Sequence, residues 1–400
     1  MTLLTLIHGN HHCFKNGTTY LKNSAREAPD GYPLSGRGYL QRYRFNEDQV
    51  RYDANEIHIK QKSKVKGLRE KGMAVLDNYS NTSILSHNNK LYTLFETKCA
   101  VEIEPETLTA ISETDFGQPL CNYLNVHGTH DSDGVYWTFS HLAMHLVIHG
   151  IYESQVVESI HIPLKGMYYI HDMIVLDDYI IFPAFPSSVD VVGAVFDTIV
   201  DSISFNSDEN LFLFIYDRES KQTTKVSMPN INAAVFHANG FKLNKNVIRL
   251  NLFLMKSGFQ LADIKTKYDF NSQCITLDIK ETKTLDDKTH FECIGLKIHS
   301  QIGDMPILDE GTQTMAYVSK DTLSIVDYQL CLQTRKFRNS ILEEPIFVAE
   351  EGGTLRIVLL VHDSINNVTR MHIICPISLK SLSIYALPFK APNGFHGTLT

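Results

Sequence analysis

Short apolar runs separated by turn residues recur along the whole chain, and amphipathic helical patterns are scarce. In MIVLDDYIIF, Asp177 and Asp178 separate two apolar runs, and in LFLFIYDRESKQTTKVSM the turn residues 217–220 separate two alternating segments. Both patterns are typical of β-hairpins. Three further strands are predicted in TLRIVLLVHDSINNVTRMHIICPISLKSLSIYALP, residues 354–388. We therefore expect an all-β protein, and the pattern alone leaves a sandwich, a barrel and a propeller open.

Two segments depart from this pattern. In IHIKQKSKVK a strand would place four lysines on one face, which suits either an edge strand protected against aggregation or a contact with anionic lipid headgroups. Residues 189–205, VDVVGAVFDTIVDSISF, have an apolar spacing that suits one helix or an apolar loop, either packed in the core or dipping into a bilayer. The four lysines are Lys60, Lys62, Lys64 and Lys66.

Composition narrows the class of protein. The chain has 400 residues, of which 43% are hydrophobic, and no evident linker, so we expect a single domain over 1–400. A net charge of -8 argues against nucleic acid as a partner. The seven cysteines are widely spaced without a C-x-x-C pair, which indicates reduced and mostly buried thiols. With no stretch of 18 apolar residues and no basic signal-like start, we expect a soluble, cytoplasmic protein.

Histidines supply the candidate chemistry. Four of them stand in the frames NVHGTHDSDG, YYIHDMIVLDDYIIF, VFHANGF and LPFKAPNGFHG, separated by 44, 66 and 159 residues. Such gaps exclude a single zinc finger or helix, whereas a propeller would bring all four to its axis. These histidines are His127, His171, His237 and His396.

Three other histidine groups are weaker candidates. In HLAMHLVIHG, the histidines at 141, 145 and 149 would share a helical face, but Leu142 stands where a metalloprotease needs its glutamate, and the even spacing suits a strand equally well. The second group, His8, His11, His12 and Cys13, is interpreted as a terminal cluster that binds metal only adventitiously. The third, His130, is interpreted as a loop residue.

Motifs of serine hydrolases, P-loop NTPases and dinucleotide-binding proteins are absent from the sequence.

Together the histidine frames resemble the carotenoid cleavage oxygenase family, which includes apocarotenoid oxygenases, stilbene-cleaving oxygenases and the retinoid isomerase. The matches run in order along nearly the whole chain. FKNGTTYLKN is similar to a strand ending in R-N-G-P, VHGTHDSDG to A-H-P-x-x-D-P-x-T-G, and YYIHDMIVLDDYIIF to M-x-H-D-F-x-x-T-x-x-Y. FHANGF is similar to F-H-x-x-N-A, EEPIFV to S-E-P-x-F-V, and APNGFHG to VPYGFHG.

This resemblance implies a seven-bladed β-propeller with Fe(II) on its axis, bound by the four framed histidines. It also implies a carboxylate behind each of three ligands: Glu96 behind His171, Asp304 behind His237 and Glu344 behind His396. The implied activity is cleavage by O2 of a conjugated carbon–carbon double bond in a carotenoid or apocarotenoid, giving two carbonyl products. A membrane-dissolved polyene also implies peripheral contact with a bilayer at the tunnel mouth.

The sequence departs from the family pattern in ways that affect these expectations. Asp304 replaces a glutamate and is one methylene shorter, so we expect a water between it and His237. Gly128 replaces a proline, which should loosen the turn after the first ligand. Phe95 stands where stilbene-cleaving relatives carry lysine, so it is a candidate tunnel residue and disfavours a stilbenoid substrate. Stilbenoid cleavage, retinoid isomerisation and a noncatalytic propeller that binds a lipid or a protein remain the alternatives.

Overall fold

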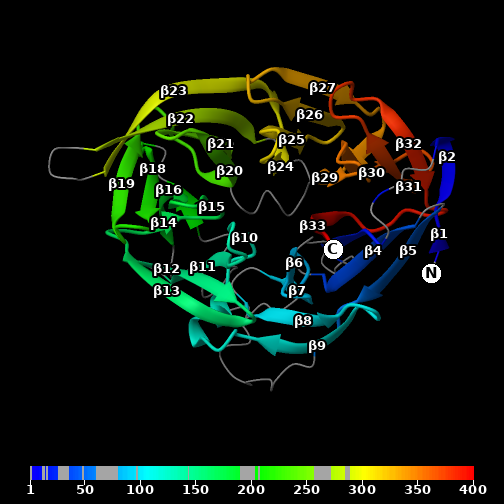
Figure 1. Ribbon diagram of the computed structural model, residues 1–400, viewed down its shortest axis with the longest axis horizontal. Coiled ribbons are helices and arrows are strands. Elements are labelled where there is room, and N and C mark those ends of the chain that lie inside the picture. Colours follow the sequence, from blue (N-terminus) through cyan, green and yellow to red (C-terminus); the bar gives the residue numbers. More distant parts are fainter. Residues whose placement is uncertain are drawn as a thin grey trace.

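Seven antiparallel β-sheets form a ring around a central axis in the computed structural model (Figure 1). In each blade the strands follow one another from the centre of the ring toward its rim, as in the series β20, β21, β22 and β23. This arrangement confirms the seven-bladed β-propeller and excludes the sandwich and the barrel. The structure describes residues 2–10, 14, 17–25, 36–46, 49–59, 80–95, 98–142, 144–189, 203–205, 208–255, 272–283 and 289–400.

Four blades have a simple order of four strands, with the first strand nearest the axis. They are β6 (Ser83–His87), β7 (Lys90–Leu94), β8 (Ala100–Glu104) and β9 (Thr109–Thr114); β10 (Thr129–His130), β11 (Tyr136–Leu142), β12 (His145–Tyr152) and β13 (Gln155–Pro163); β20 (Val235–Asn244), β21 (Val247–Leu254), β22 (Gln273–Lys283) and β23 (Thr289–Ile302); and β24 (Asp304–Asp309), β25 (Thr314–Val318), β26 (Thr322–Val326) and β27 (Leu332–Lys336). A fifth blade contains β14 (Tyr168–Tyr169), β15 (Ile174–Val175), β16 (Tyr179–Val189), β17 (Ile203–Phe205), β18 (Leu211–Asp217) and β19 (Thr223–Met228).

The two ends of the chain complete the remaining two blades. The last strand, β33, is the innermost strand of the blade β1-β5-β4-β3-β33, and the second strand, β2, is the outermost strand of the blade that contains β28 to β32. The ring is therefore closed by strand pairing from both ends. The strands are β1 (Thr2–Leu3), β3 (Thr19–Ala25), β4 (Gly38–Asn46), β5 (Gln49–Glu56) and β33 (Gly394–Leu399), and β2 (Thr5–Gly9), β28 (Ser340–Leu342), β29 (Ile346–Ala349), β30 (Leu355–Asp363), β31 (Val368–Ile374) and β32 (Ser381–Ala386).

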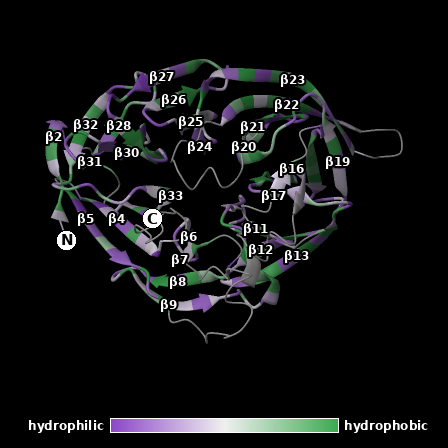
Figure 2. Cartoon of the chain, turned by 180° about the vertical axis from the view of Figure 1, so that it is seen from behind, coloured by the Kyte–Doolittle hydropathy of each residue, from purple (hydrophilic) through white to green (hydrophobic). Residues whose placement is uncertain are grey.

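Strand composition follows the position of each strand in its blade. Middle strands such as β12, β21 and β30 are buried on both faces, because neighbouring blades pack against each side, and they read as nearly continuous apolar runs. Outer strands such as β19 and β27 alternate or are mostly exposed. Purple and green bands accordingly alternate along the outer strand β23 in Figure 2.

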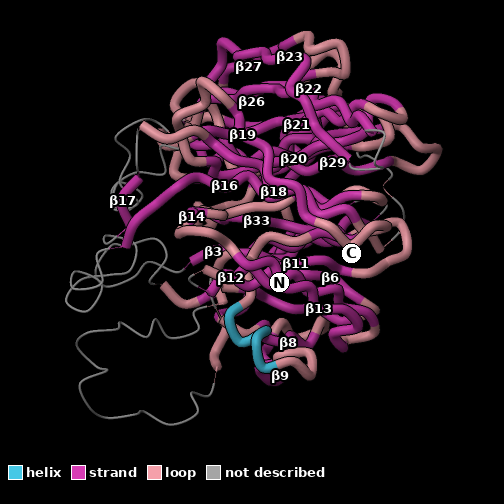
Figure 3. Tube along the Cα trace, turned by 90° about the vertical axis from the view of Figure 1, so that its left-hand side faces the viewer, coloured by secondary structure: helices cyan, strands magenta, loops and turns pink. Residues whose placement is uncertain are grey.

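The hydrophobic core consists of clusters between adjacent blades. One cluster joins Ile181 and Leu213 to Leu250, and another packs Phe139 of the preceding blade against Phe182. Seen from the side in Figure 3, the short 3-10 helix η1 (Pro119–Tyr123) lies at the end of the molecule near β8 and β9.

Buried arginines add polar ties between blades. Arg249 pairs with Asp278 of its own blade at 2.7 Å and donates to the Tyr328 carbonyl oxygen of the next blade at 2.6 Å. Arg42 likewise pairs with Asp53 and donates to carbonyl groups of the following blade. These contacts and the apolar clusters keep the inner strands in fixed positions around the axis.

The predicted hairpins are confirmed. β15 pairs with β16 and β18 with β19, and residues 354–388 contain the three expected strands β30, β31 and β32. The six described cysteines are free thiols, as expected, but the expectation that most are buried is wrong, because only Cys121 and Cys274 of the six are buried. Within 189–205, both the expected helix and the expected loop are wrong for the described residues, because Val189 ends strand β16 and Ile203–Phe205 form strand β17. Residues 190–202 and the four alternating lysines lie outside the described residues.

Candidate metal centre

The four framed histidines lie on or beside the innermost strands of four different blades. His237 belongs to β20 and His396 to β33. His127 lies two residues before the start of β10, and His171 lies between β14 and β15. Closure of the ring therefore brings together in space four histidines that are too far apart in the sequence to belong to one local motif.

Their imidazole rings converge on the axis. The ring centroid of His127 lies 4.5 Å from that of His171, and 5.1 and 5.0 Å from those of His237 and His396. One ring nitrogen from each of His127, His237 and His396 lies within 4.8 Å of the other two. Nitrogens that share one ion at about 2.1 Å are about 3.0 to 4.2 Å apart, so a small inward movement of these rings is sufficient for coordination.

Unpartnered nitrogens show that the site fits a metal. Nε2 of His127 and Nε2 of His237 are buried without a hydrogen-bond partner among the described residues. Leaving such an atom unsatisfied costs about 1–3 kcal/mol, which a metal bond would offset. Burial, followed by the neighbouring imidazoles, holds the pKa of His127 and of His171 well below the usual value. These two rings are therefore neutral at neutral pH, as metal ligands must be.

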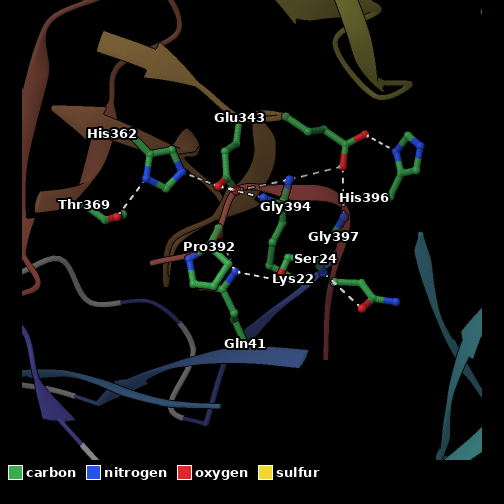
Figure 4. A network of polar contacts seen from close by, with 12 residues as sticks. Lys22, Ser24, Gln41, Glu343, His362, Thr369, Pro392, Gly394, His396 and Gly397 are labelled. Carbon is green, nitrogen blue, oxygen red and sulfur yellow. Dashed lines mark hydrogen bonds and ion pairs between the residues drawn. The ribbon is translucent and has the colours of Figure 1, made fainter. Parts of the chain in front are cut away.

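Carboxylates lie behind two of the rings. Nδ1 of His237 donates to Oδ1 of Asp304 at 2.5 Å. Nδ1 of His396 donates to Oε1 of Glu344 at 2.9 Å, the dashed contact drawn to His396 in Figure 4. With the proton on Nδ1, the lone pair of Nε2 is available to a metal. Burial opposes ionisation, but His396 and then Lys22 outweigh it and lower the pKa of Glu344. Burial likewise opposes protonation of His237, but Asp304 raises its pKa.

The expected water between Asp304 and His237 is wrong, because the contact is direct. Asp304 opens β24 and is 1% exposed, and its other oxygen accepts the Ser272 hydroxyl at 3.1 Å. The preceding Gly303 has no Cβ that would collide with Tyr317 at 2.6 Å, so the backbone approaches closely. The position of the strand compensates for the missing methylene.

His171 has a different environment. Its Nδ1 donates to the Phe236 carbonyl oxygen at 2.6 Å, and its ring stacks on the Phe236 ring at 4.1 Å with an interplanar angle of 22°. Glu96, the carboxylate expected behind His171, lies outside the described residues. The Phe236 contact, which sequence reasoning missed, fixes the orientation of this imidazole from the neighbouring blade.

Asp172 is a second residue of the site that sequence reasoning missed. Its two oxygens accept the backbone N–H groups of Met173 at 2.7 Å and Ala238 at 2.8 Å, which ties the His171 segment to the His237 strand. Oδ1 also lies 3.9 Å from Nδ1 of His127. Burial raises the pKa of Asp172 to about 6. The signal was its place directly after His171 in the matched frame.

Gly128 does not loosen its turn, which corrects the expectation. A Cβ at this position would lie 2.4 Å from the Tyr136 hydroxyl oxygen and 2.5 Å from the Trp137 carbonyl oxygen. Glycine here permits a close approach of β11 to the segment that carries His127. The turn is crowded, and Thr138 donates to the carbonyl oxygen of His127 at 3.2 Å.

The competing histidines occupy other places. His141 lies on β11, whereas His145 and His149 lie on the paired strand β12, so neither a single helix nor a single strand carries all three. His149 is enclosed between the hydroxyls of Ser140 and Ser159. His130 is a strand residue of β10 rather than a loop residue, and its Nε2 lies 3.0 Å from Nδ1 of His87. Residues 11–13 lie outside the described part of the chain.

The candidate tunnel residue Phe95 follows β7 and its side chain is 2% exposed. Its carbonyl oxygen accepts the N–H of Lys98 at 3.2 Å. The side chain is therefore held inside the propeller rather than on its surface. Its role as a tunnel residue stays a prediction.

A ring of seven antiparallel blades with clustered axial imidazoles and supporting carboxylates defines a β-propeller with a candidate four-histidine metal centre. The family model described as RPE65, retinal pigment epithelial membrane protein, matches residues 13–400. The chain belongs to this family, the carotenoid cleavage oxygenases, whose members are enzymes. A search of curated proteins found no match.

Solved structures show the same fold. A mutant of the Synechocystis apocarotenoid oxygenase and the cobalt-substituted form of that enzyme each share 17% identity with the chain, with a TM-score of 0.82, over 98% of this chain and 94% of the other. A chimera of the apocarotenoid oxygenase with RPE65 has 17% identity and a TM-score of 0.83, over 100% and 95% of the two chains. Among the described residues, no helix is both long and apolar enough to cross a membrane.

Proposed function

We propose that the protein is a non-haem Fe(II) dioxygenase that cleaves a conjugated double bond of a carotenoid or apocarotenoid. Family membership supports this general kind of reaction. The observation that carries the proposal is the pair of buried, unpartnered Nε2 atoms of His127 and His237, aimed into a cluster of imidazoles. A scaffold without metal would have no reason to retain these unsatisfied atoms. In this proposal the metal ligands are His127, His171, His237 and His396, and the supporting carboxylates are Glu96, Asp304 and Glu344.

The protein residues would prepare the centre for chemistry. Asp304 and Glu344 hold the proton on Nδ1 of their histidines, which directs Nε2 toward the axis. Four neutral imidazoles suit Fe(II) and leave coordination positions open. Fe(II) bound there would activate O2, so that one oxygen atom enters each of two carbonyl products.

Aromatic side chains would position the polyene. Phe236 stacks on His171, and Tyr169 lies on the same ring with 6.0 Å between centroids. Tyr169 in turn contacts Phe205 at 5.3 Å. We expect these rings, together with Phe95, to line the substrate tunnel beside the proposed metal. Phe95 in place of a lysine disfavours a phenolic stilbenoid, which needs a polar group for its hydroxyl.

We further propose that residues 1–400 form one domain.

We also propose that the protein contacts a bilayer peripherally through part of residues 189–205. The apolar spacing of that segment supports this membrane contact. Liposome binding should fall when Val195 and Phe196 are both replaced by aspartate. Unchanged binding would indicate that the segment packs in the core.

The function is tested with the iron-loaded protein, purified anaerobically and then given 18O2 with a panel of carotenoids, apocarotenoids, retinoid esters and stilbenes. We expect paired carbonyl products from a polyene, each initially carrying one 18O atom, and none from His237→Ala. Isomerised product without O2 consumption would instead establish isomerase chemistry. Bound polyene without any product would favour the noncatalytic propeller.

A further inference from the structure

Lys22 is a buried cation close to the candidate metal centre. Its side chain is 0% exposed, and Nζ lies 3.6 Å from Oε2 of Glu343 and 4.0 Å from Oε2 of Glu344 (Figure 4). Nζ has no hydrogen-bond partner among the described residues. An ammonium group in this position is costly to bury, and nearby carboxylates are what compensates it. The burial of this ammonium group therefore depends on the two carboxylates beside it.

Strand pairing brings Lys22 to the ligand strand. β3 pairs with β33, so that Lys22 is opposite Gly397. A Cβ at Gly394 would lie 2.5 Å from Cε and 2.6 Å from Cγ of Lys22. Gly394 therefore leaves the space through which the lysine side chain crosses the backbone beside His396.

The two glutamates bracket His396. Glu343 accepts the backbone N–H of Gly394 at 2.9 Å, and Glu344 accepts that of Gly397 at 2.9 Å. Glu344 also accepts Nδ1–H of His396. Because the backbone is held on both sides of the ligand, the direction of the imidazole depends on where these carboxylates lie.

A hydrogen-bond chain holds Glu343 on the side away from Lys22. His362 bonds to Glu343 through Nε2 and contacts the Thr369 hydroxyl through Nδ1 at 2.8 Å, and that hydroxyl oxygen accepts the Ala391 N–H at 2.8 Å. On its other side Glu343 faces Lys22, and Lys22 is the one ammonium group among the described residues that lies within 4.0 Å of both Glu343 and Glu344.

We propose that Lys22 is a positioning residue for the metal centre. Its ammonium group holds Glu343 and Glu344 together against their mutual repulsion, and through them it fixes the backbone and ring of His396. The inference rests on the proposed function at one point, namely that His396 binds the metal.

Anaerobic titration of the metal-free protein with Co(II) tests the proposal. The visible Co(II) spectrum reports ligand geometry, and the titration gives the affinity. We expect Lys22→Met to weaken binding about 10- to 100-fold, the range for lost outer-shell partners, and to alter the spectrum. Lys280→Met is the matched control, because this exposed strand lysine lies on β22, opposite Val247 and Glu292, and should leave both readouts unchanged.

Adding Glu343→Gln to Lys22→Met removes the repulsion and should restore most of the affinity and the wild-type spectrum. A role limited to filling space predicts no such rescue. Unchanged binding by Lys22→Met, or a double variant no better than the single one, would overturn the proposal. If Lys22→Met does not fold, a folded double variant that binds like Glu343→Gln supports it, and an unfolded one overturns it. Failure of the wild-type protein to bind Co(II) would instead remove the metal centre itself, and with it the proposed function.

Discussion

Asp304 offers the most direct quantitative test of how the protein supports its metal. The aspartate is 1% exposed and accepts three hydrogen bonds, from Nδ1 of His237, the N–H of Met305 and the hydroxyl of Ser272. Asp304→Asn can keep an oxygen toward His237 and Met305, so mainly the charge is lost. A charge-assisted hydrogen bond exceeds a neutral one by about 1.4 kcal/mol, so we expect metal affinity to fall about tenfold.

Asp304→Ala is the more severe perturbation. It leaves the N–H groups of His237 and Met305 buried without this acceptor, at about 1–3 kcal/mol each. Metal affinity should fall toward the 100-fold end of the range for outer-shell partners. The assay is anaerobic metal titration, with circular dichroism to confirm the fold. Wild-type affinity in a folded Asp304→Ala protein would refute the reasoning.

Asp304→Glu separates direct contact from a water-mediated one. Because the His237 bond is direct at 2.5 Å, an added methylene has to be accommodated in a full space, at about 1–3 kcal/mol of stability. We expect a lower melting temperature and weaker metal binding. Improved binding would show that a gap exists after all.

Three further predictions concern other positions. Gly128→Ala should destabilise the fold by about 1–3 kcal/mol through collision with Tyr136, seen as a lower melting temperature, whereas exposed Gly134→Ala, with no atom near its would-be Cβ, should show only backbone strain. Phe95→Lys should abolish polyene turnover while iron content is retained, and unchanged turnover would remove Phe95 from the site. Burial, then Arg335, lowers the pKa of His372 to about 3. Because the unfolded histidine titrates near pH 6.5, protons bind the unfolded chain first, and the free energy of unfolding should fall by up to ~1.4 kcal/mol per pH unit from about pH 6.5 to 3. Urea melts of His372→Gln should show a shallower pH dependence than the wild type.

Much of the fold could be predicted from the sequence because strand and turn signals are local. The DD turn after Val175 and the alternating residues after Leu211 specify hairpins without reference to the rest of the chain. The number of blades could not be derived in this way, since the strands carry no clean sequence repeat. It followed from the family resemblance of the histidine frames, and ring closure by β2 and β33 became visible only in the structure.

The finer features of the site depend on backbone position, which sequence does not encode locally. A count of methylenes suggested a gap at Asp304, yet the start of β24 is close enough for direct contact. Gly128 suggested a turn with more backbone freedom than proline would allow, yet strand β11 occupies the space beside its Cα. Lys22 read as one more strand residue, because its two carboxylate partners are more than 300 positions away in the chain.

The central claim is that four histidines bind one iron, and iron quantification after anaerobic reconstitution tests it most directly. The wild-type protein and His149→Gln, whose histidine is enclosed between two serines away from the centre, should carry stoichiometric iron. Iron should be lost or strongly depleted when any one of His127, His171, His237 and His396 is replaced by alanine. Stoichiometric iron in all four folded alanine variants, or none in the wild type, would contradict the account.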